Sequence, residues 1–257
     1  MTEHPPYPTA NSTADFRRNL ATVQDRMAAA ANRVGRSPGA VRLLPVSKTV
    51  DSSRLRHAIA AGCTELGENK VQEALRKSVE LADIPGLRWH VIGHLQSNKA
   101  KFVAQFAHEF QALDRLSLAR TLNNRLEAAD RTLDVMVQIN TSGEDSKFGL
   151  PPQEADAFIR ELPAFERLRV RGLMTLAANS PEQDRVRACF ESLHSLRGRL
   201  RENAPSGVEL SELSMGMSGD FELAIEEGAT VVRVGQAIFG PRALPDSYYW
   251  PEGEENS

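Results

Sequence analysis

The sequence predicts an α/β protein built as a single TIM-type (β/α)8 barrel with an extra helix at its N-terminus. Apolar strand-like runs and helical stretches alternate eight times within the 257 residues, which is the pattern of such a barrel. Several runs, including residues 133–139 and 231–235, are apolar without alternation, as expected for parallel strands covered by helices. A doubly wound open sheet is the alternative, but it favours a glycine-rich turn after the first strand, and residues 47–51 contain no glycine.

The individual elements follow from apolar spacing and from turn residues. Ser12 and Asp15 resemble a capping box, and apolar residues then recur at helical spacing until Gly35, so the first helix is expected there. The eight strands are expected at residues 41–47, 64–67, 88–93, 109–113, 133–139, 168–175, 209–214 and 231–235. The later helices are expected at residues 52–61, 71–82, 98–107, 115–129, 151–161, 181–203 and 220–227.

The domain organisation is simple. No linker interrupts the alternation, so residues 12–245 are predicted to form one barrel domain. Residues 1–11 and 246–257 are rich in proline, glutamate, serine and asparagine, and they are predicted to be mobile tails.

Composition excludes several classes of function. The net charge is −3 with acids and bases interspersed, so nucleic acid and anionic membranes are not expected partners. No apolar run approaches the roughly 20 residues of a membrane span, and the N-terminus does not resemble a secretory signal. Cys63 and Cys189 are too few for a disulfide framework or a thiolate metal site. We expect a cytoplasmic protein with buried, reduced thiols and no metal site.

Lys48 lies where the first predicted strand ends, and in a barrel the functional residues collect at these C-terminal strand ends. A lysine amine that is partly removed from water loses basicity and becomes a nucleophile toward aldehydes. The alternative is a lysine whose amine simply extends into solvent. The choice between them depends on what else lies at the same end of the barrel.

The loops after the seventh and eighth strands have the features of a phosphate site. Residues 214–220 lead directly into a short helix, and Gly216, Gly219 and Gly235 allow the backbone to approach an anion closely. The Ser218 hydroxyl can donate to a phosphate oxygen. The alternative is that these glycines serve tight turns and that Ser218 caps the following helix.

Arg233 lies inside the eighth strand, so its guanidinium can point into the top of the barrel. It could pair with an acid such as Glu68 or Glu212. It could instead donate to a ring nitrogen of a bound heterocycle, and because arginine stays protonated, that nitrogen would be neutral.

Seven longer segments contain these strand-end residues or lie close to them in the sequence. They are Val-Ser-Lys-Thr at 46–49, Gly-Glu-Asn at 67–69, Trp-His-Val-Ile-Gly-His-Leu-Gln-Ser-Asn-Lys at 89–99, Ser-Lys-Phe-Gly at 146–149, Arg-Gly-Leu-Met at 171–174, Leu-Ser-Met-Gly-Met-Ser at 213–218 and Val-Arg-Val-Gly-Gln-Ala-Ile-Phe-Gly at 232–240. Through them the sequence resembles the pyridoxal 5′-phosphate (PLP) homeostasis protein family over roughly residues 15–243. The resemblance implies a barrel like the N-terminal domain of alanine racemase.

The resemblance also implies roles for individual residues. Lys48 would hold PLP as an internal aldimine, a Schiff base, and Arg233 would face the pyridine nitrogen. Asn69 and Met174 would line the ring pocket. The phosphate would be held by one hydroxyl and by nearby backbone amides, at Ser218, Gly219, Gly235 and Gln236. Gln236 is a departure, since many relatives carry a small residue there, but a backbone contact would survive it.

A PLP carrier in vitamin B6 homeostasis is the expected function, without robust turnover. The family resemblance points this way, too few residues follow the last strand for the second domain that supplies alanine racemase with its opposing tyrosine, and a neutral pyridine is a weak electron sink. The alternatives are a PLP enzyme with weak racemase or lyase activity and a cofactor-free Schiff-base lyase. The expected partners are PLP and, transiently, PLP-dependent apoenzymes, and the family expectation is a monomer.

The sequence leaves the roles of four further polar residues undecided. Lys147 is either a second amine that receives PLP or a solvated loop lysine beside Asp145. His90, His94 and Lys99 are either rim residues of the site or structural polar groups.

Overall fold

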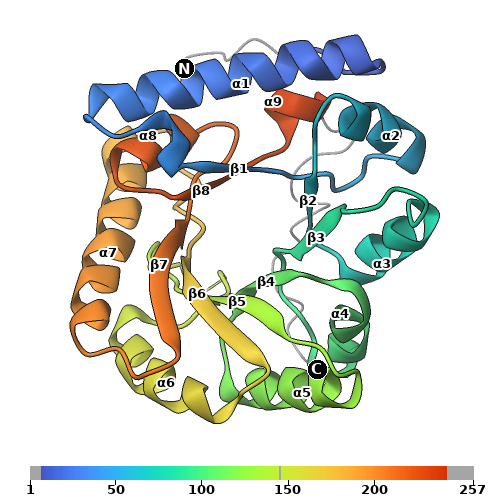
Figure 1. The fold of residues 1–257 in the computed structure, drawn as a ribbon. Helices are drawn as coiled ribbons and strands as arrows, with labels where there is room; N and C mark the ends of the chain where they lie inside the picture. The colour runs from blue at the N-terminus through green and yellow to red at the C-terminus, as the bar shows by residue number, and fades with distance from the viewer. Residues whose placement is uncertain (1–6, 145, 242–257) are drawn as a thin grey trace.

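Eight parallel strands form the barrel of the computed structural model, which describes residues 7–144 and 146–241 (Figure 1). In chain order the strands are β1 (Arg42–Pro45), β2 (Glu65–Glu68), β3 (Arg88–Val91), β4 (Glu109–Leu113), β5 (Leu133–Gln138), β6 (Leu168–Met174), β7 (Val208–Ser214) and β8 (Val231–Val234). They pair in the order β1-β8-β7-β6-β5-β4-β3-β2. A bridge between Val46 and Gly67, with the Ser47 N–H donating to the Gly67 carbonyl at 2.9 Å, joins β1 to β2. The barrel prediction is confirmed, and the open sheet is wrong.

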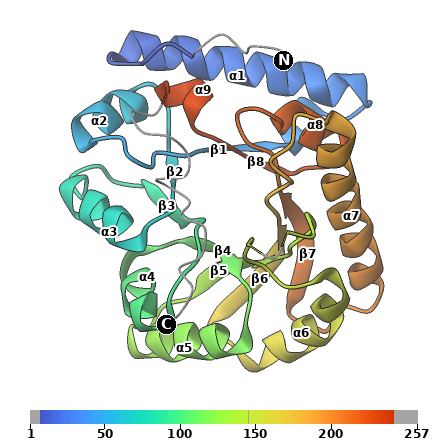
Figure 2. The ribbon, with the colours of Figure 1, turned by 180° about the vertical axis from the view of Figure 1, so that it is seen from behind.

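Helices cover the outside of the barrel in both views (Figures 1 and 2). They are α1 (Thr13–Arg33), α2 (Ser52–Ala60), α3 (Val71–Glu80), α4 (Ala100–Phe106), α5 (Leu116–Ala128), α6 (Ala155–Glu161), α7 (Gln183–Glu202), α8 (Phe221–Glu226) and α9 (Gln236–Phe239). Every expected strand and helix overlaps an observed one. The helix α9 has no counterpart among the expected elements, because four residues are too few to show a helical period.

The extra helix α1 lies across α2, α8 and α9 on the outside of the barrel (Figures 1 and 2). Its buried face contacts α9 directly, since the rings of Phe16 and Phe239 meet edge to face at 5.4 Å between centroids. The Asn19 side-chain amide also donates to the Ile238 carbonyl at 3.0 Å. α1 therefore fixes the short helix that follows β8, and with it the backbone around Gly235.

The predicted capping box at the start of α1 is present. The Asp15 N–H donates to the Ser12 hydroxyl at 3.2 Å, and the Ser12 N–H donates to the Asp15 carboxylate at 3.1 Å. These bonds satisfy backbone donors that a helix start otherwise leaves unpaired.

Replacing Ser12 by alanine is therefore expected to lower the free energy of unfolding by about 1 kcal/mol. Urea unfolding of the purified proteins measures the change. The matched control is Thr22→Ala, also exposed on α1 but in its interior, where the hydroxyl bonds the Arg18 carbonyl and caps nothing. An equal loss in both variants would show that the cap does not contribute.

Several expectations about the rest of the chain can be compared with the described residues. Cys63 and Cys189 are both buried and free of disulfides, and burial raises the pKa of the Cys63 thiol to about 12. Of the two predicted tails, residues 1–6 and 246–257 lie outside the described part, whereas Ala10 is buried and its carbonyl accepts from Arg54 of α2 at 2.7 Å. Among the described helices, none has the length and apolar character needed to cross a membrane. No group of side chains arranged to hold a metal occurs in residues 7–144 and 146–241.

Candidate functional site

The C-terminal ends of the strands bring the predicted site residues to one end of the barrel. Lys48 follows β1, Asn69 follows β2, and Arg233 lies in β8. Ser218 lies in the loop after β7, and Met174 is the last residue of β6. Since β2, β1, β8, β7 and β6 are successive neighbours around the barrel, residues far apart in sequence share one rim.

Lys48 is buried at this rim, with 8% of its surface exposed. The residue before it, Ser47, is fully buried. The Val50 N–H donates to the Ser47 carbonyl at 3.1 Å, so Lys48 occupies a tight turn. A lysine whose amine extends into solvent, the alternative considered from the sequence, does not match this burial.

Arg233 is also buried, and its hydrogen bonds go to neutral groups. Its Nη1 donates to the Ser214 hydroxyl at 2.6 Å and its Nη2 to the Thr175 carbonyl at 2.8 Å. Burial lowers the pKa of Arg233 to about 10, and the Asp220 carboxylate offsets part of this effect. The group still carries its charge at neutral pH, and within the described residues it forms no ion pair.

The acid partners considered for Arg233 are engaged elsewhere. Glu68 pairs with Lys77 at 2.7 Å, and Glu212 pairs with Arg42 at 3.1 Å. Neither of the two acids named from the sequence therefore forms an ion pair with Arg233. Its cationic edge is oriented by neutral acceptors, which suits donation to a ligand that enters the rim.

A chain of buried polar groups runs from Arg233 through the barrel interior. The Ser214 hydroxyl donates to the Gln111 amide oxygen at 2.7 Å, and the Gln111 amide donates to Glu109 at 2.6 Å. Arg42 then donates to Glu109 at 2.9 Å at the N-terminal end of the strands. Because Ser214 uses its proton on Gln111, it presents a lone pair to Arg233. The sequence did not predict this row of buried polar groups, although Glu109 and Gln111 alternate with apolar residues in β4.

The carboxylate at the lower end of this chain has a strongly shifted pKa. Burial opposes the ionisation of Glu109, but the hydrogen bond with His90 and the charge of Arg42 outweigh it and lower the pKa to about 2. A carboxyl whose pKa is lower in the folded state than in the unfolded state stabilises the fold at pH values above its unfolded-state pKa. This contribution is lost as the pH falls toward the folded pKa.

We therefore expect wild type to lose about 1 kcal/mol more unfolding free energy than Glu109→Gln when the pH falls from about 7 to about 4. Urea unfolding at both pH values gives the difference. The matched control, Glu209→Gln, removes an exposed carboxylate that pairs with Arg171. Parallel losses in wild type and Glu109→Gln would contradict the expectation.

Ser218 connects the loop after β7 with the backbone after β8. Its hydroxyl oxygen accepts from the Gly235 N–H at 3.2 Å and from the Ala237 N–H at 3.4 Å. Ser218 does not cap α8, whose N-cap residue is Asp220, so the helix-cap alternative is wrong. Two backbone amides and one hydroxyl thus converge where the sequence predicts a phosphate, with Gly219 and Gln236 adjacent in the chain.

Asn69 and Met174 are placed differently at the rim. Both side-chain polar atoms of Asn69 are buried and have no hydrogen-bond partner among the described residues, which marks a place for a polar ligand group. A side chain on Gly93 would collide with the Asn69 backbone, so the loop after β3 packs closely here. Met174 is fully buried, and its contact with a ligand ring stays a prediction.

The structure shows the surroundings of the four polar residues whose roles the sequence could not decide. His90 is fully buried with its Nδ1 2.9 Å from Glu109, so it is structural. His94 lies after β3 and stacks on Phe148 at 3.9 Å. The Lys147 amine donates to the Ala177 carbonyl at 2.8 Å and pairs with Glu144 at 3.0 Å. Lys99 lies in a half-buried turn after β3, and Asp145 lies outside the described residues.

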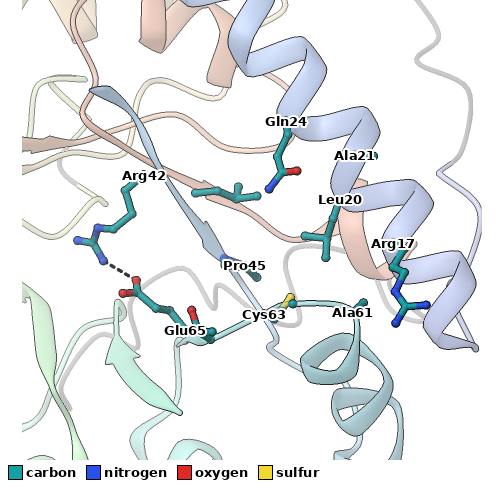
Figure 3. A pocket seen from close by; sticks show the side chains of 12 residues that line it. Arg17, Leu20, Ala21, Gln24, Arg42, Pro45, Ala61, Cys63 and Glu65 are labelled. Carbon is teal, nitrogen blue, oxygen red and sulfur yellow. Dashed lines mark hydrogen bonds and ion pairs between the residues drawn. The ribbon is translucent and has the colours of Figure 1, made fainter. Parts of the chain in front are cut away.

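A separate groove of about 360 Å³ lies between α1 and β1 (Figure 3). Leu20 and Gln24 of α1 line one side, and Cys63 lies on the other. Arg42 and Glu65, the first residues of β1 and β2, also line the groove and form an ion pair at 2.8 Å. The groove therefore lies beside the outer face of β1 and does not contain the predicted site residues.

Comparisons with known proteins agree with this geometry. The family model described as "Alanine racemase, N-terminal domain" matches residues 17–243. The pyridoxal phosphate homeostasis protein of Pseudomonas aeruginosa is 43% identical, over 87% of this chain and 94% of that protein. The structure of PipY from Synechococcus elongatus with PLP bound is 34% identical, with a TM-score of 0.76 over 88% of this chain and 100% of that one. An alanine racemase from Streptomyces lavendulae, at 19% identity and a TM-score of 0.68 over 93% of this chain and 61% of that one, shares the fold.

Proposed function

Because the chain belongs to the pyridoxal phosphate homeostasis protein family, we propose that it binds PLP at the C-terminal rim of its barrel, with the Lys48 amine as covalent anchor. The observation that carries the proposal is the convergence of three unlike groups from neighbouring strands. They are the buried Lys48 after β1, the guanidinium of Arg233 in β8, and the Ser218 hydroxyl after β7. When bound, PLP supplies an aldehyde, which condenses with a primary amine and releases one water.

These residues fit the aldehyde, the pyridine nitrogen and the phosphate of PLP. Arg233 is protonated and fixed by Ser214, so it would donate to the pyridine nitrogen and keep that nitrogen neutral. The amides that now donate to Ser218 would turn to the phosphate, together with the hydroxyl itself. The Asn69 amide, which has no hydrogen-bond partner in the described part of the chain, would find one in the ligand.

The same geometry favours holding PLP over transforming substrates with it. A neutral pyridine nitrogen makes the ring a weak electron sink, which disfavours carbanion chemistry. The curated relative from Pseudomonas aeruginosa is matched over 94% of its length, whereas the racemase from Streptomyces lavendulae is matched over 61% and shows the fold alone. We therefore propose a carrier that takes part in PLP homeostasis and has no robust catalytic cycle.

The covalent anchor is tested by borohydride reduction and peptide mapping. Protein incubated with PLP should gain a visible absorption band, lose it on borohydride treatment, and then carry one phosphopyridoxyl group on Lys48. Reduction fixes the C=N bond as a stable secondary amine, so mass spectrometry reads the attachment site directly. A protein that gains no band, or a label on another lysine, would overturn the proposal.

The absence of turnover has a separate test. Amino acids are incubated in deuterated water with PLP-loaded protein, and exchange of the α-proton is followed by NMR. Little exchange above a PLP blank is expected. Exchange that requires Lys48 would instead establish a racemase or lyase. Monomeric state, cytoplasmic location and transient contact with PLP-dependent apoenzymes are the remaining parts of the proposal.

A further inference from the structure

An ion cluster centred on the buried amine of Lys77 lies against the turn that carries Lys48. Lys77 of α3 is fully buried, and its amine donates to the Ser47 carbonyl at 2.8 Å. The same amine lies 2.7 Å from a carboxylate oxygen of Glu68 and 2.7 Å from one of Glu73. Three ionisable groups from β2 and α3 thus meet at the end of β1.

The two carboxylates of this cluster hold the residues on either side of Lys48. The Ser47 hydroxyl donates to Glu68 at 2.6 Å, and the Thr49 N–H donates to Glu73 at 2.9 Å. Lys77 joins the two carboxylates to each other. The turn that carries Lys48 is therefore fixed at both ends by one cluster.

The turn itself adopts a conformation that its sequence disfavours. Thr49 has φ of 68°, in the left-handed region that favours glycine. A β-branched residue there costs on the order of 1–3 kcal/mol and persists only where the surroundings impose it. The bond from the Thr49 N–H to Glu73 is such a constraint.

Stability alone gives little reason for this arrangement. Removing charges from water costs about as much as their mutual attraction returns, so apolar residues of similar size often stabilise as well. Here three ionisable groups and a strained turn converge on the two neighbours of a single lysine. The arrangement is therefore better explained by what it does to Lys48.

We infer that Glu68, Glu73 and Lys77 are positioning residues, which hold the Ser47–Thr49 turn so that the Lys48 amine faces the aldehyde of PLP. The inference rests on the proposed function and gives three residues outside the predicted site a role in it. Covalent capture depends steeply on placement, since an error of about 1 Å can reduce a rate about a hundredfold. The phosphate and pyridine contacts come from β7 and β8 instead, so loosening the turn leaves them in place.

The test compares Glu73→Ala with Glu73→Gln. Alanine removes the acceptor of the Thr49 N–H, whereas glutamine keeps an amide oxygen there. We expect Glu73→Ala to slow the growth of the visible PLP band at least about tenfold. Its affinity for pyridoxine 5′-phosphate, which has an alcohol in place of the aldehyde, should equal that of wild type. Glu73→Gln should recover most of the rate.

Glu80→Ala is the matched control, because Glu80 is an exposed carboxylate on the same helix whose partners are Arg76 and Ser52. It should bind PLP at the wild-type rate. A Glu73→Ala rate equal to wild type, or an equal loss of pyridoxine 5′-phosphate affinity, would overturn the inference. A wild-type protein that never gains the band would instead overturn the proposed function.

Thr49→Gly supplies a second test that does not depend on removing a charge. Glycine adopts a positive φ without strain, so the fold is retained while the turn gains freedom. The rate of covalent capture should fall, and the affinity for pyridoxine 5′-phosphate should not change. An unchanged rate in this variant would contradict the role given to the turn.

Discussion

Lys48→Arg is expected to lose covalent PLP binding completely, with no visible band at any PLP concentration and no label after borohydride reduction. Arginine keeps the positive charge and much of the length of the side chain, but its guanidinium does not condense with an aldehyde under these conditions. The loss is therefore chemical and does not require a change of fold. Absorption spectra and mass spectrometry of wild type and variant measure it.

The same variant should retain the non-covalent contacts. Its affinity for pyridoxine 5′-phosphate is expected to fall by less than about tenfold, or about 1.4 kcal/mol, because Arg233 and the Ser218 loop are unchanged. Lys147→Ala is the control for the anchor, since Lys147 lies in the loop after β5 and its amine is held by Glu144 of that loop and by the Ala177 carbonyl after β6. It should keep the full band. Persistent labelling of Lys48→Arg would place the anchor on a different lysine.

The set of residues at the rim could be predicted from the sequence because the barrel topology alone determines which residues share that end. Apolar runs locate the strands, and once eight parallel strands are accepted, the residues after them must share one end. Lys48 and Ser218 are 170 positions apart in the chain, yet β1, β8 and β7 are successive neighbours. No side-chain detail is needed for that conclusion.

Side-chain partnerships are a different matter, as Arg233 shows. From the sequence, Glu68 and Glu212 were equally reasonable partners for it. Only the packing reveals that Lys77 engages one and Arg42 the other. The choice depends on which helix and strand faces meet, and apolar periodicity does not encode it.

Lys77 is the clearest example of what the sequence hides. Glu73 and Lys77 are four residues apart on a helix, which is the usual spacing of an exposed surface pair. The structure instead buries Lys77 completely against the Ser47 carbonyl. Burial of this kind follows from the packing of α3 against β2 and β3, which brings the Lys77 amine to the end of β1. It gives an ordinary-looking lysine a large energetic role.

Lys77→Met is accordingly expected to lower the free energy of unfolding by about 3–5 kcal/mol. Methionine fills much of the volume of the lysine stem but leaves Glu68 and Glu73 without their shared cation. It also leaves the buried Ser47 carbonyl without the donor on Lys77. Urea unfolding at about pH 8 measures the loss, and Lys101→Met, on the exposed side of α4, is the control.

The pH dependence of this loss identifies its origin. Burial raises the pKa of Glu68 to about 7, against the opposing charge of Lys77. A carboxyl raised in this way is protonated in the folded state where the unfolded chain has released its proton, so stability falls as the pH rises from about 4.5 toward about 7. Without Lys77 the ionised form is penalised further, so the loss in Lys77→Met should be larger at about pH 8 than at about pH 5.

A double variant separates charge from packing. Adding Glu68→Gln to Lys77→Met removes the carboxylate that the lost cation left behind, so part of the stability should return, most of all at about pH 8. Equal losses at both pH values, with no recovery in the double variant, would mean that Lys77 stabilises the fold through packing alone. Recovery of stability without recovery of the PLP capture rate would show that the cluster serves placement of Lys48 beyond its part in the fold.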